Sequence, residues 1–131
     1  MRVLLDTHIL VYWVASPERL SAAQAHAVET ISPENPALVA DISLWEIALL
    51  SSLGRLRLNL PVRDWLTRAT APPLVRIAAI SPPVASAVGD LAEWENRDPA
   101  DRLITATAQV FGAAVLTNDD AIRDSGLVQV V

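Results

Sequence analysis

Two residue types are missing from this chain of 131 residues: it contains no cysteine and no lysine. Without cysteine there is no disulfide, no zinc site built on thiolates and no cysteine nucleophile, and the chain is compatible with a reducing compartment. All ten basic residues are arginine. This excludes chemistry that needs an ammonium group, such as Schiff-base formation or a phosphate-loop lysine.

Positive charge and long apolar runs are also scarce. The net charge of −5 argues against a broad nonspecific nucleic-acid surface, although an acidic metal site can have arginines beside it, because the ion reverses the local sign. The longest uncharged apolar run, residues 103–118, is shorter than the ~20 residues of a bilayer-spanning helix, and Asp6 interrupts the N-terminal apolar run too early for a signal peptide. We expect a cytoplasmic protein without a membrane span, with one domain over residues 1–131.

Short apolar runs alternate with amphipathic segments along the chain. Strands are predicted at residues 3–5, 37–40, 74–80, 113–117 and 127–131. Helices are predicted from a Thr7 cap to about residue 14, and at 21–31, 41–53, 61–69, 82–92, 99–111 and 121–124, with an extended segment at 55–60. Strands that alternate with helices, without hairpin signals, indicate an α/β fold with a parallel sheet covered on both faces.

Four separated acids have a route to one pocket. Asp6 and Asp119 follow predicted strands, and the carboxyl ends of parallel strands are where open α/β sheets bind their ligands. Glu46 lies in a helix whose residues three and four positions away are Ile42, Ser43, Leu49 and Leu50, so no arginine at helical spacing neutralises it. These positions favour a functional role for Glu46 over a solvated one.

The fourth acid is Asp101, in a helix that opens with two carboxylates. Asp98 suits the N-cap and Pro99 the first helical position, so Asp101 is the third residue and shares a face with Asp98. In the simplest interpretation Asp98 is a cap, Asp101 occupies the capping-box position and Arg102 pairs with Asp98. Gathered carboxylates repel one another unless a cation joins them, and an all-oxygen set suits Mg²⁺ or Mn²⁺. Such ions activate water for phosphodiester hydrolysis.

Two histidines add little to this set. His8 could face the pocket or the surface, and we expect the surface, because no second histidine lies near enough to form a metal-binding pair. His26 is expected on a solvated helix face.

Four blocks together give the sequence a resemblance to the PIN-domain ribonucleases, specifically the VapC-type toxins of bacterial toxin–antitoxin pairs. The blocks are Leu4-Leu5-Asp6-Thr7-His8, Ile42-Ser43-Leu44-Trp45-Glu46-Ile47, Arg97-Asp98-Pro99-Ala100-Asp101-Arg102-Leu103-Ile104 and Val115-Leu116-Thr117-Asn118-Asp119. The resemblance implies a three-layer α/β/α sandwich around a mostly parallel sheet of about five strands. It also implies a metal-dependent endoribonuclease that binds RNA, forms homodimers or a larger assembly, and is inhibited by a cognate antitoxin covering the site.

The resemblance assigns roles to individual residues. It makes Asp6, Glu46, Asp101 and Asp119 the catalytic, metal-binding acids, with Asp98 an auxiliary acid and Mg²⁺ or Mn²⁺ the ion. Thr7, Ser43 and Thr117 are the hydroxyl residues expected to support the acids. Arg102 and Arg97 are the expected contacts to RNA phosphates, although pairing with Asp98 explains Arg102 equally well.

Other interpretations explain less of the sequence. A phosphoacceptor receiver domain needs a lysine that is absent, and a haloacid-dehalogenase-like phosphatase would have a second Asp at the position of His8. A noncatalytic interaction module, binding a partner through the helices around Trp45 and Trp65, accounts for Asp98 as a cap but not for Glu46.

Overall fold

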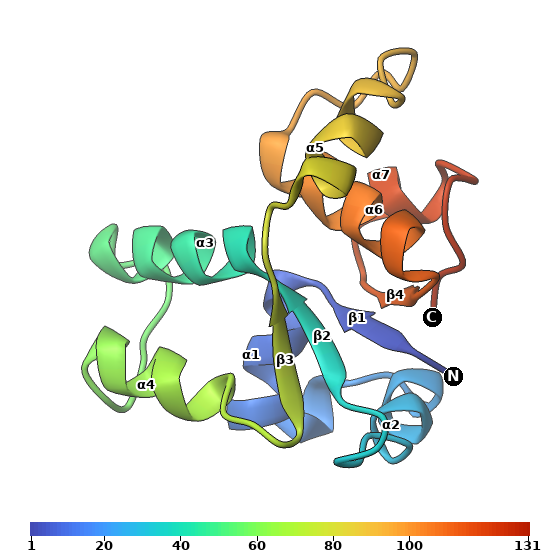
Figure 1. Cartoon of the computed structure of the whole chain (residues 1–131). Helices are drawn as coiled ribbons and strands as arrows, with labels where there is room; N and C mark the ends of the chain where they lie inside the picture. Colours follow the sequence, from blue (N-terminus) through green and yellow to red (C-terminus); the bar gives the residue numbers. More distant parts are fainter.

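A parallel sheet of four strands forms the centre of the computed structural model, which describes all 131 residues (Figure 1). The strands are β1 (Val3–Leu5), β2 (Ala37–Ala40), β3 (Val75–Ala78) and β4 (Ala114–Leu116). Their spatial order is β3-β2-β1-β4, and every pair is parallel. The chain thus builds outward from β1 to β3 on one side and then returns to place β4 on the other side of β1. The carboxyl ends of β1 and β4 therefore flank the switch point where such sheets bind ligands.

Both faces of the sheet are covered, which explains why its strands are apolar without interruption. Side chains alternate along each strand, so Val3 and Leu5 pack on one face while Leu4 packs on the other. The first face is covered by helices α1 to α4 through residues such as Ile9, Ile47 and Trp65. Ile104 of α6 and Ile122 of α7 cover the second face. This is the predicted three-layer α/β/α arrangement.

The helices follow the predicted order, with shorter ends in several places. They are α1 (Thr7–Ala15), the 3-10 turn η1 (Pro17–Arg19), α2 (Ala22–Val28), α3 (Asp41–Ser52), α4 (Val62–Ala69), α5 (Pro82–Gly89), α6 (Pro99–Phe111) and α7 (Asp120–Arg123). The predicted helix at 21–31 ends at Val28, and the one at 82–92 ends at Gly89. Helix α6 has the predicted ends: Asp98 is its N-cap and Gly112, with a φ of 61°, its left-handed C-cap.

Two other predictions about the elements were wrong in detail. Asp6, rather than Thr7, is the N-cap of α1, because its side chain accepts a hydrogen bond from the Thr7 N–H. The predicted fifth strand at residues 127–131 forms only a parallel bridge between Val115 and Val130. Backbone hydrogen bonds still join this segment to β4, including Val115 N to Gln129 O at 2.9 Å and Val131 N to Val115 O at 2.9 Å. The segment lies beside the sheet edge, but its pairing with β4 is too short to count as a strand.

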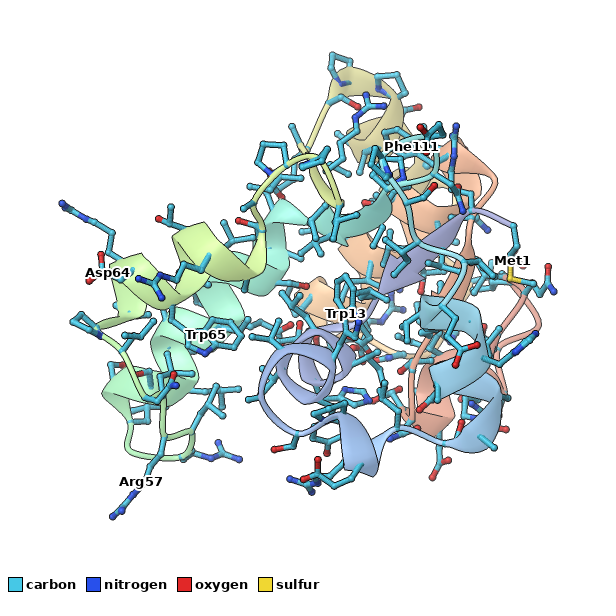
Figure 2. The ribbon with its side chains drawn as sticks, turned by 90° about the horizontal axis from the view of Figure 1, so that it is seen from below. Met1, Trp13, Arg57, Asp64, Trp65 and Phe111 are labelled. Atoms are coloured by element: carbon cyan, nitrogen blue, oxygen red, sulfur yellow. The ribbon has the colours of Figure 1, made fainter.

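Helices α3 and α4 form an antiparallel arm that projects from one side of the sheet (Figures 1 and 2). The connection between them, residues 53–61, forms no strand. Its alternating pattern follows burial, since Leu56, Leu58 and Leu60 pack half-buried against the core while Arg55 and Arg57 are exposed. None of the helices is both long and apolar enough to span a bilayer.

Candidate active site

All five acids singled out in the sequence line one cavity of about 410 Å³ at the carboxyl ends of β1 and β4. They are Asp6, Glu46, Asp98, Asp101 and Asp119. Elements far apart in the sequence contribute them: the start of α1, the middle of α3, the start of α6 and the start of α7. The rest of the wall consists of Thr7, His8, Val11, Tyr12, Arg19, Leu50 and Leu56.

Three of these carboxylates are also helix N-caps. Asp6 caps α1, Asp98 caps α6 by accepting from the Asp101 N–H at 3.0 Å, and Asp119 caps α7 by accepting from the Ile122 N–H at 3.0 Å. Each helix start thus fixes one carboxylate oxygen, and the partial positive charge of the unpaired N–H groups offsets part of the negative charge. The same three side chains thus start the helices and place their carboxylates in the cavity.

Hydroxyl groups orient two of the acids. The Thr117 hydroxyl donates to Asp6 Oδ2 at 2.5 Å and accepts from the Asp119 N–H at 2.9 Å, so one buried side chain connects both strand ends. The Thr7 hydroxyl donates to Glu46 Oε1 at 2.5 Å, and its oxygen lies 2.9 Å from Ser43 Oγ. The structure therefore brings Thr7 and Thr117 against the acids directly, and Ser43 against them through Thr7.

Asn96 is a site residue that the sequence reasoning missed. Its amide Nδ2 donates to Asp101 Oδ2 at 2.8 Å, while its Oδ1 accepts from the Asp98 N–H at 3.0 Å. The second bond is a turn typical of Asn, whose side chain bonds the backbone two residues on. The signal in the sequence was an Asn two residues before an N-cap. In that turn the side-chain oxygen bonds the backbone, so the side-chain nitrogen is left to face the following helix.

Burial raises the pKa of both Asp101 and Glu46. The pKa of Asp101 rises from 3.8 to about 6, because desolvation and the charges of Asp119, Asp98 and Asp6 outweigh the hydrogen bond from Asn96. The pKa of Glu46 is also raised, mainly by desolvation and further by the charges of Asp6 and Asp98, against the hydrogen bond from Thr7. No arginine forms an ion pair with either acid. The cavity therefore holds more negative charge than its own residues neutralise.

His8 faces the cavity, so the expectation that it lies on the surface was wrong. Its Nε2 accepts a hydrogen bond from the Asn118 N–H at 2.9 Å, and its Nδ1 lies 3.7 Å from Asp6 Oδ2. Accepting at Nε2 fixes the proton of the neutral ring on Nδ1, on the side of Asp6. The expectation failed because it considered only metal pairs, whereas the ring is held by the backbone after β4.

Arg102 does not form the expected ion pair with Asp98. Its guanidinium donates instead to three backbone carbonyls, those of Asn96 at 2.8 Å, Trp94 at 2.8 Å and Leu91 at 3.0 Å. Each of its three nitrogens donates one of these bonds, so Arg102 fixes the loop that carries Asn96. Its predicted contact to an RNA phosphate stays a prediction.

Two other arginines border the site. Arg97 is exposed and makes only a 3.4 Å bond to the Ala92 carbonyl. Arg19, the single basic residue of the cavity wall, lies with its guanidinium 4.4 Å from the centre of the Tyr12 ring.

The donor set of the cavity suits a hard divalent cation. One oxygen of Glu46, Asp98, Asp101 and Asp119 accepts a hydrogen bond, and the other oxygen of each has no partner. Such unpartnered carboxylate oxygens, in a cavity with uncompensated negative charge, match the ligands that Mg²⁺ and Mn²⁺ prefer. No three Asp, Glu or His side chains are placed to hold one ion as they stand. Binding an ion therefore requires side-chain rotation, which the free oxygens allow.

An apolar surface adjoins the acids. A second cavity, of about 510 Å³, shares Glu46 and Asp98 with the first and is otherwise mostly apolar, including Trp45 and Leu49 of α3. Trp45 is 58% exposed, and Leu53 at the end of the helix is 59% exposed. Exposed apolar groups of this size beside a pocket are typical of a protein-binding surface.

Comparison with known proteins gives concordant similarities. The family model for the PIN domain matches residues 3–126. The chain is 40% identical over 121 residues to "Ribonuclease VapC22" of Mycobacterium tuberculosis, a match that covers 92% of this chain and 89% of the relative.

Solved structures of distant sequence share the fold. A structure of VapBC2 from Rickettsia felis, bound to a DNA fragment from their promoter, matches with a TM-score of 0.73 and 19% identity, over 100% of this chain and 98% of the other. A toxin-antitoxin complex from Klebsiella pneumoniae matches with a TM-score of 0.64 and 20% identity, over 98% of this chain and 95% of the other.

Proposed function

The chain belongs to the PIN-domain family, and from this premise we propose that it is a toxin of the VapC type: a metal-dependent endoribonuclease that hydrolyses RNA phosphodiester bonds and is inhibited by a cognate antitoxin. The observation that carries the proposal is the gathering of five carboxylates, from four separate elements, in one cavity without an arginine ion pair. The relative's printed name, a ribonuclease, agrees with this chemistry. The cytoplasm, where RNA substrates occur, is the location that the proposal assigns.

Asp6, Glu46, Asp101 and Asp119 would hold Mg²⁺ or Mn²⁺, with Asp98 assisting. The chemistry that the ion supplies when bound is activation of water as a nucleophile and neutralisation of charge on the phosphate. The fit rests on the unpartnered oxygens of Glu46, Asp101 and Asp119 and on the charge that no arginine balances.

The protein's own groups orient the acids. Thr117 holds Asp6, Thr7 holds Glu46 and Asn96 holds Asp101. Asn96 occupies Asp101 Oδ2, so Oδ1 is the oxygen that would face the ion. Arg97, exposed at the start of α6, is the proposed phosphate contact beside the acids.

Protein partners belong to the same proposal. The exposed apolar face of α3, with Trp45, Leu49 and Leu53, offers a surface for a second copy or for the antitoxin. It borders the acid cavity, so a chain bound there also limits access to the acids. A noncatalytic interaction module would explain this face but gives no reason for Glu46 and Asp101 to lie half-buried in one cavity, each with an unpartnered oxygen.

Cleavage of RNA with and without metal tests the proposal. A labelled single-stranded RNA is incubated with the wild type and with Asp101→Asn, in Mn²⁺, in Mg²⁺ and in chelator. We expect metal-dependent internal cuts by the wild type, reduced about 100-fold or more in Asp101→Asn. The circular dichroism of the variant should be unchanged, because Asn is nearly the same size.

Asp98→Asn serves as the matched control. Its amide oxygen can still cap α6, and its carboxylate is the auxiliary one, so its loss of activity should be smaller than that of Asp101→Asn. Cleavage that persists in chelator, or an Asp101→Asn variant as active as the wild type, would contradict the proposal.

A further inference from the structure

The arginines whose guanidinium groups have no partner in the protein all lie in one segment. Of the ten arginines, six donate to a backbone carbonyl or lie over an aromatic ring. The four that form no side-chain hydrogen bond, ion pair or cation–π contact all lie between residues 55 and 68: Arg55, Arg57, Arg63 and Arg68. All four are exposed. No Asp or Glu occurs between Glu46 and Asp64, so this part of an acidic protein is locally positive.

Two of these arginines are the chain neighbours of Leu56, a residue of the acid-cavity wall. Leu56, Leu58 and Leu60 pack against the core, while Arg55 and Arg57, on either side of Leu56, are exposed. Figure 2 shows Arg57 extending from the end of the α3–α4 arm into open space. Neither guanidinium belongs to the cavity wall, but both start from the stretch of chain that forms part of it.

The electrostatics of the cavity create a need for such groups. An RNA strand brings one negative charge per nucleotide toward five carboxylates, and the arginine of the cavity wall is already placed over Tyr12. Arg102, beside the acids in sequence, is held in place by three backbone carbonyls. Exposed, unpartnered guanidinium groups bind phosphate oxygens in pairs and attract a polyanion from a distance.

We propose that Arg55 and Arg57 form a phosphate-binding patch, which holds the RNA strand outside the cleaved bond against the rim of the acid cavity. This inference rests on the proposed ribonuclease function and names the surface that the substrate occupies. RNA is favoured over an acidic protein because a strand whose phosphate reaches the acids must cross the adjoining rim, where Leu56 places these two arginines. An acidic protein has no such constraint.

Binding measured as a function of salt tests the patch. The probe is a fluorescent single-stranded RNA of about 12 nucleotides, and the protein carries Asp101→Asn so that the RNA stays intact. Arg55→Ala and Arg57→Ala should each lower the slope of log K against log salt by about 0.7 and weaken binding several-fold at low salt. Arg57→Lys, which keeps the charge, should retain most of the slope.

Arg68→Ala is the matched control. Arg68 is equally exposed and unpartnered, but it lines a separate cavity of about 310 Å³ with Trp13, Pro72 and Leu74. It removes the same charge from the same arm and should leave the slope unchanged. If Arg55→Ala and Arg57→Ala bind RNA like Arg68→Ala, the patch proposal is overturned.

Cleavage by otherwise wild-type protein separates the two proposals. We expect Arg55→Ala and Arg57→Ala to raise KM with kcat unchanged, because neither residue reaches the acids. Wild-type protein that cuts no RNA, while its binding still depends on Arg55 and Arg57, would overturn the nuclease and support the patch. If the variants lose affinity for poly-glutamate and keep it for RNA, the patch binds acidic protein and the proposal fails.

Discussion

Individual side chains in the cavity are held by contacts that isosteric substitutions can remove. Thr117 is the clearest case, because its hydroxyl contacts Asp6 and the Asp119 N–H at once. Thr117→Val should lower RNA cleavage about 10- to 100-fold, since both acids lose their orientation. It should also destabilise the protein by about 1–3 kcal/mol, because a buried N–H loses its acceptor. Cleavage kinetics and urea unfolding measure the two effects.

Thr107→Val on α6 is the control for this prediction. Thr107 is buried like Thr117, but its hydroxyl donates to the Leu103 carbonyl and touches no acid. It should change stability without changing cleavage. Equal losses of activity in both variants would show that Thr117 acts only through packing.

The raised pKa of Asp101 predicts how stability depends on pH. The folded protein keeps the Asp101 proton up to about pH 6, whereas the unfolded chain releases it near 3.8. The folded state binds more protons between these values, so the contribution of Asp101 to stability is lost as the pH rises through this window. Asp101→Asn removes the effect: its stability relative to the wild type should increase from about pH 4 to pH 6 and then level off.

Urea unfolding in chelator, from pH 4 to pH 8, measures this difference. Glu46 titrates in both proteins and largely cancels. A difference that stays constant, or that shrinks as the pH rises, would show that Asp101 is not the group responsible.

Residue types and positions in the sequence were enough to single out the five acids, because each follows a strand or starts a helix, or, as with Glu46, lacks a helical neighbour that could neutralise it. The hydroxyls of Thr7, Ser43 and Thr117 were expected only from the family resemblance. The partners of Asn96 and Arg102 were not predictable in the same way. Both depend on the path of the loop at residues 91–96, and a sequence without regular periodicity does not reveal where its carbonyls point. The sequence offered an RNA phosphate and Asp98 as partners of Arg102, and neither is among the three carbonyls that it binds.

At the scale of elements, Arg102 joins α6 to the preceding loop. Removing its three charge-assisted hydrogen bonds with Arg102→Ala should destabilise the protein by about 3 kcal/mol, as measured by urea unfolding. Arg102→Lys should restore little, because an ammonium group cannot match three carbonyls arranged around a planar fork. Cleavage should fall as well, since the loop carries Asn96. A variant of normal stability with weakened RNA binding would instead restore the original assignment of Arg102 to phosphate.

Helix α6 and the connection at 55–60 show what sequence patterns can predict about elements. The ends of α6 were predicted because Asp98, Pro99 and Gly112 each favour one position of a helix terminus for a local reason. The alternation at 55–60 predicted an extended segment, yet no strand forms there; the pattern follows the partial burial of Leu56, Leu58 and Leu60. Alternation reports burial of one side, whereas a strand also requires a neighbour with which to pair. The segment at 127–131 has a neighbour in β4 but pairs over too short a length.

For the whole molecule, the order of the strands was not predictable from sequence, although the parallel sheet was. The placement of β4 beside β1 depends on packing over both faces, and it creates the switch point where Asp6 and Asp119 meet. The rule that sites lie at the carboxyl ends of strands nevertheless predicted that Asp6 and Asp119 lie close together, and it does not require the strand order.

Ion binding should stabilise the whole fold, because it relieves the repulsion among the acids. Millimolar Mn²⁺ or Mg²⁺ should raise Tm at pH 8. An ion present at a hundred times its Kd adds about 2.7 kcal/mol to the free energy of unfolding. The rise should be smaller at pH 5, where Asp101 holds a proton in competition with the ion. Differential scanning fluorimetry with a matched concentration of NaCl measures this. An equal rise of Tm in the Asp101→Asn variant would show that the ion binds at another site.

The use of Asp6 and Asp119 as helix caps has a genetic consequence. A single base change converts an Asp codon to an Asn codon, and Asn is as good an N-cap as Asp. A single base change can thus remove the activity of the cavity and leave the protein folded, whereas most mutations that remove activity by unfolding also remove the protein. A population under pressure to lose this activity should accumulate folded, inert alleles that still present every other surface to a partner.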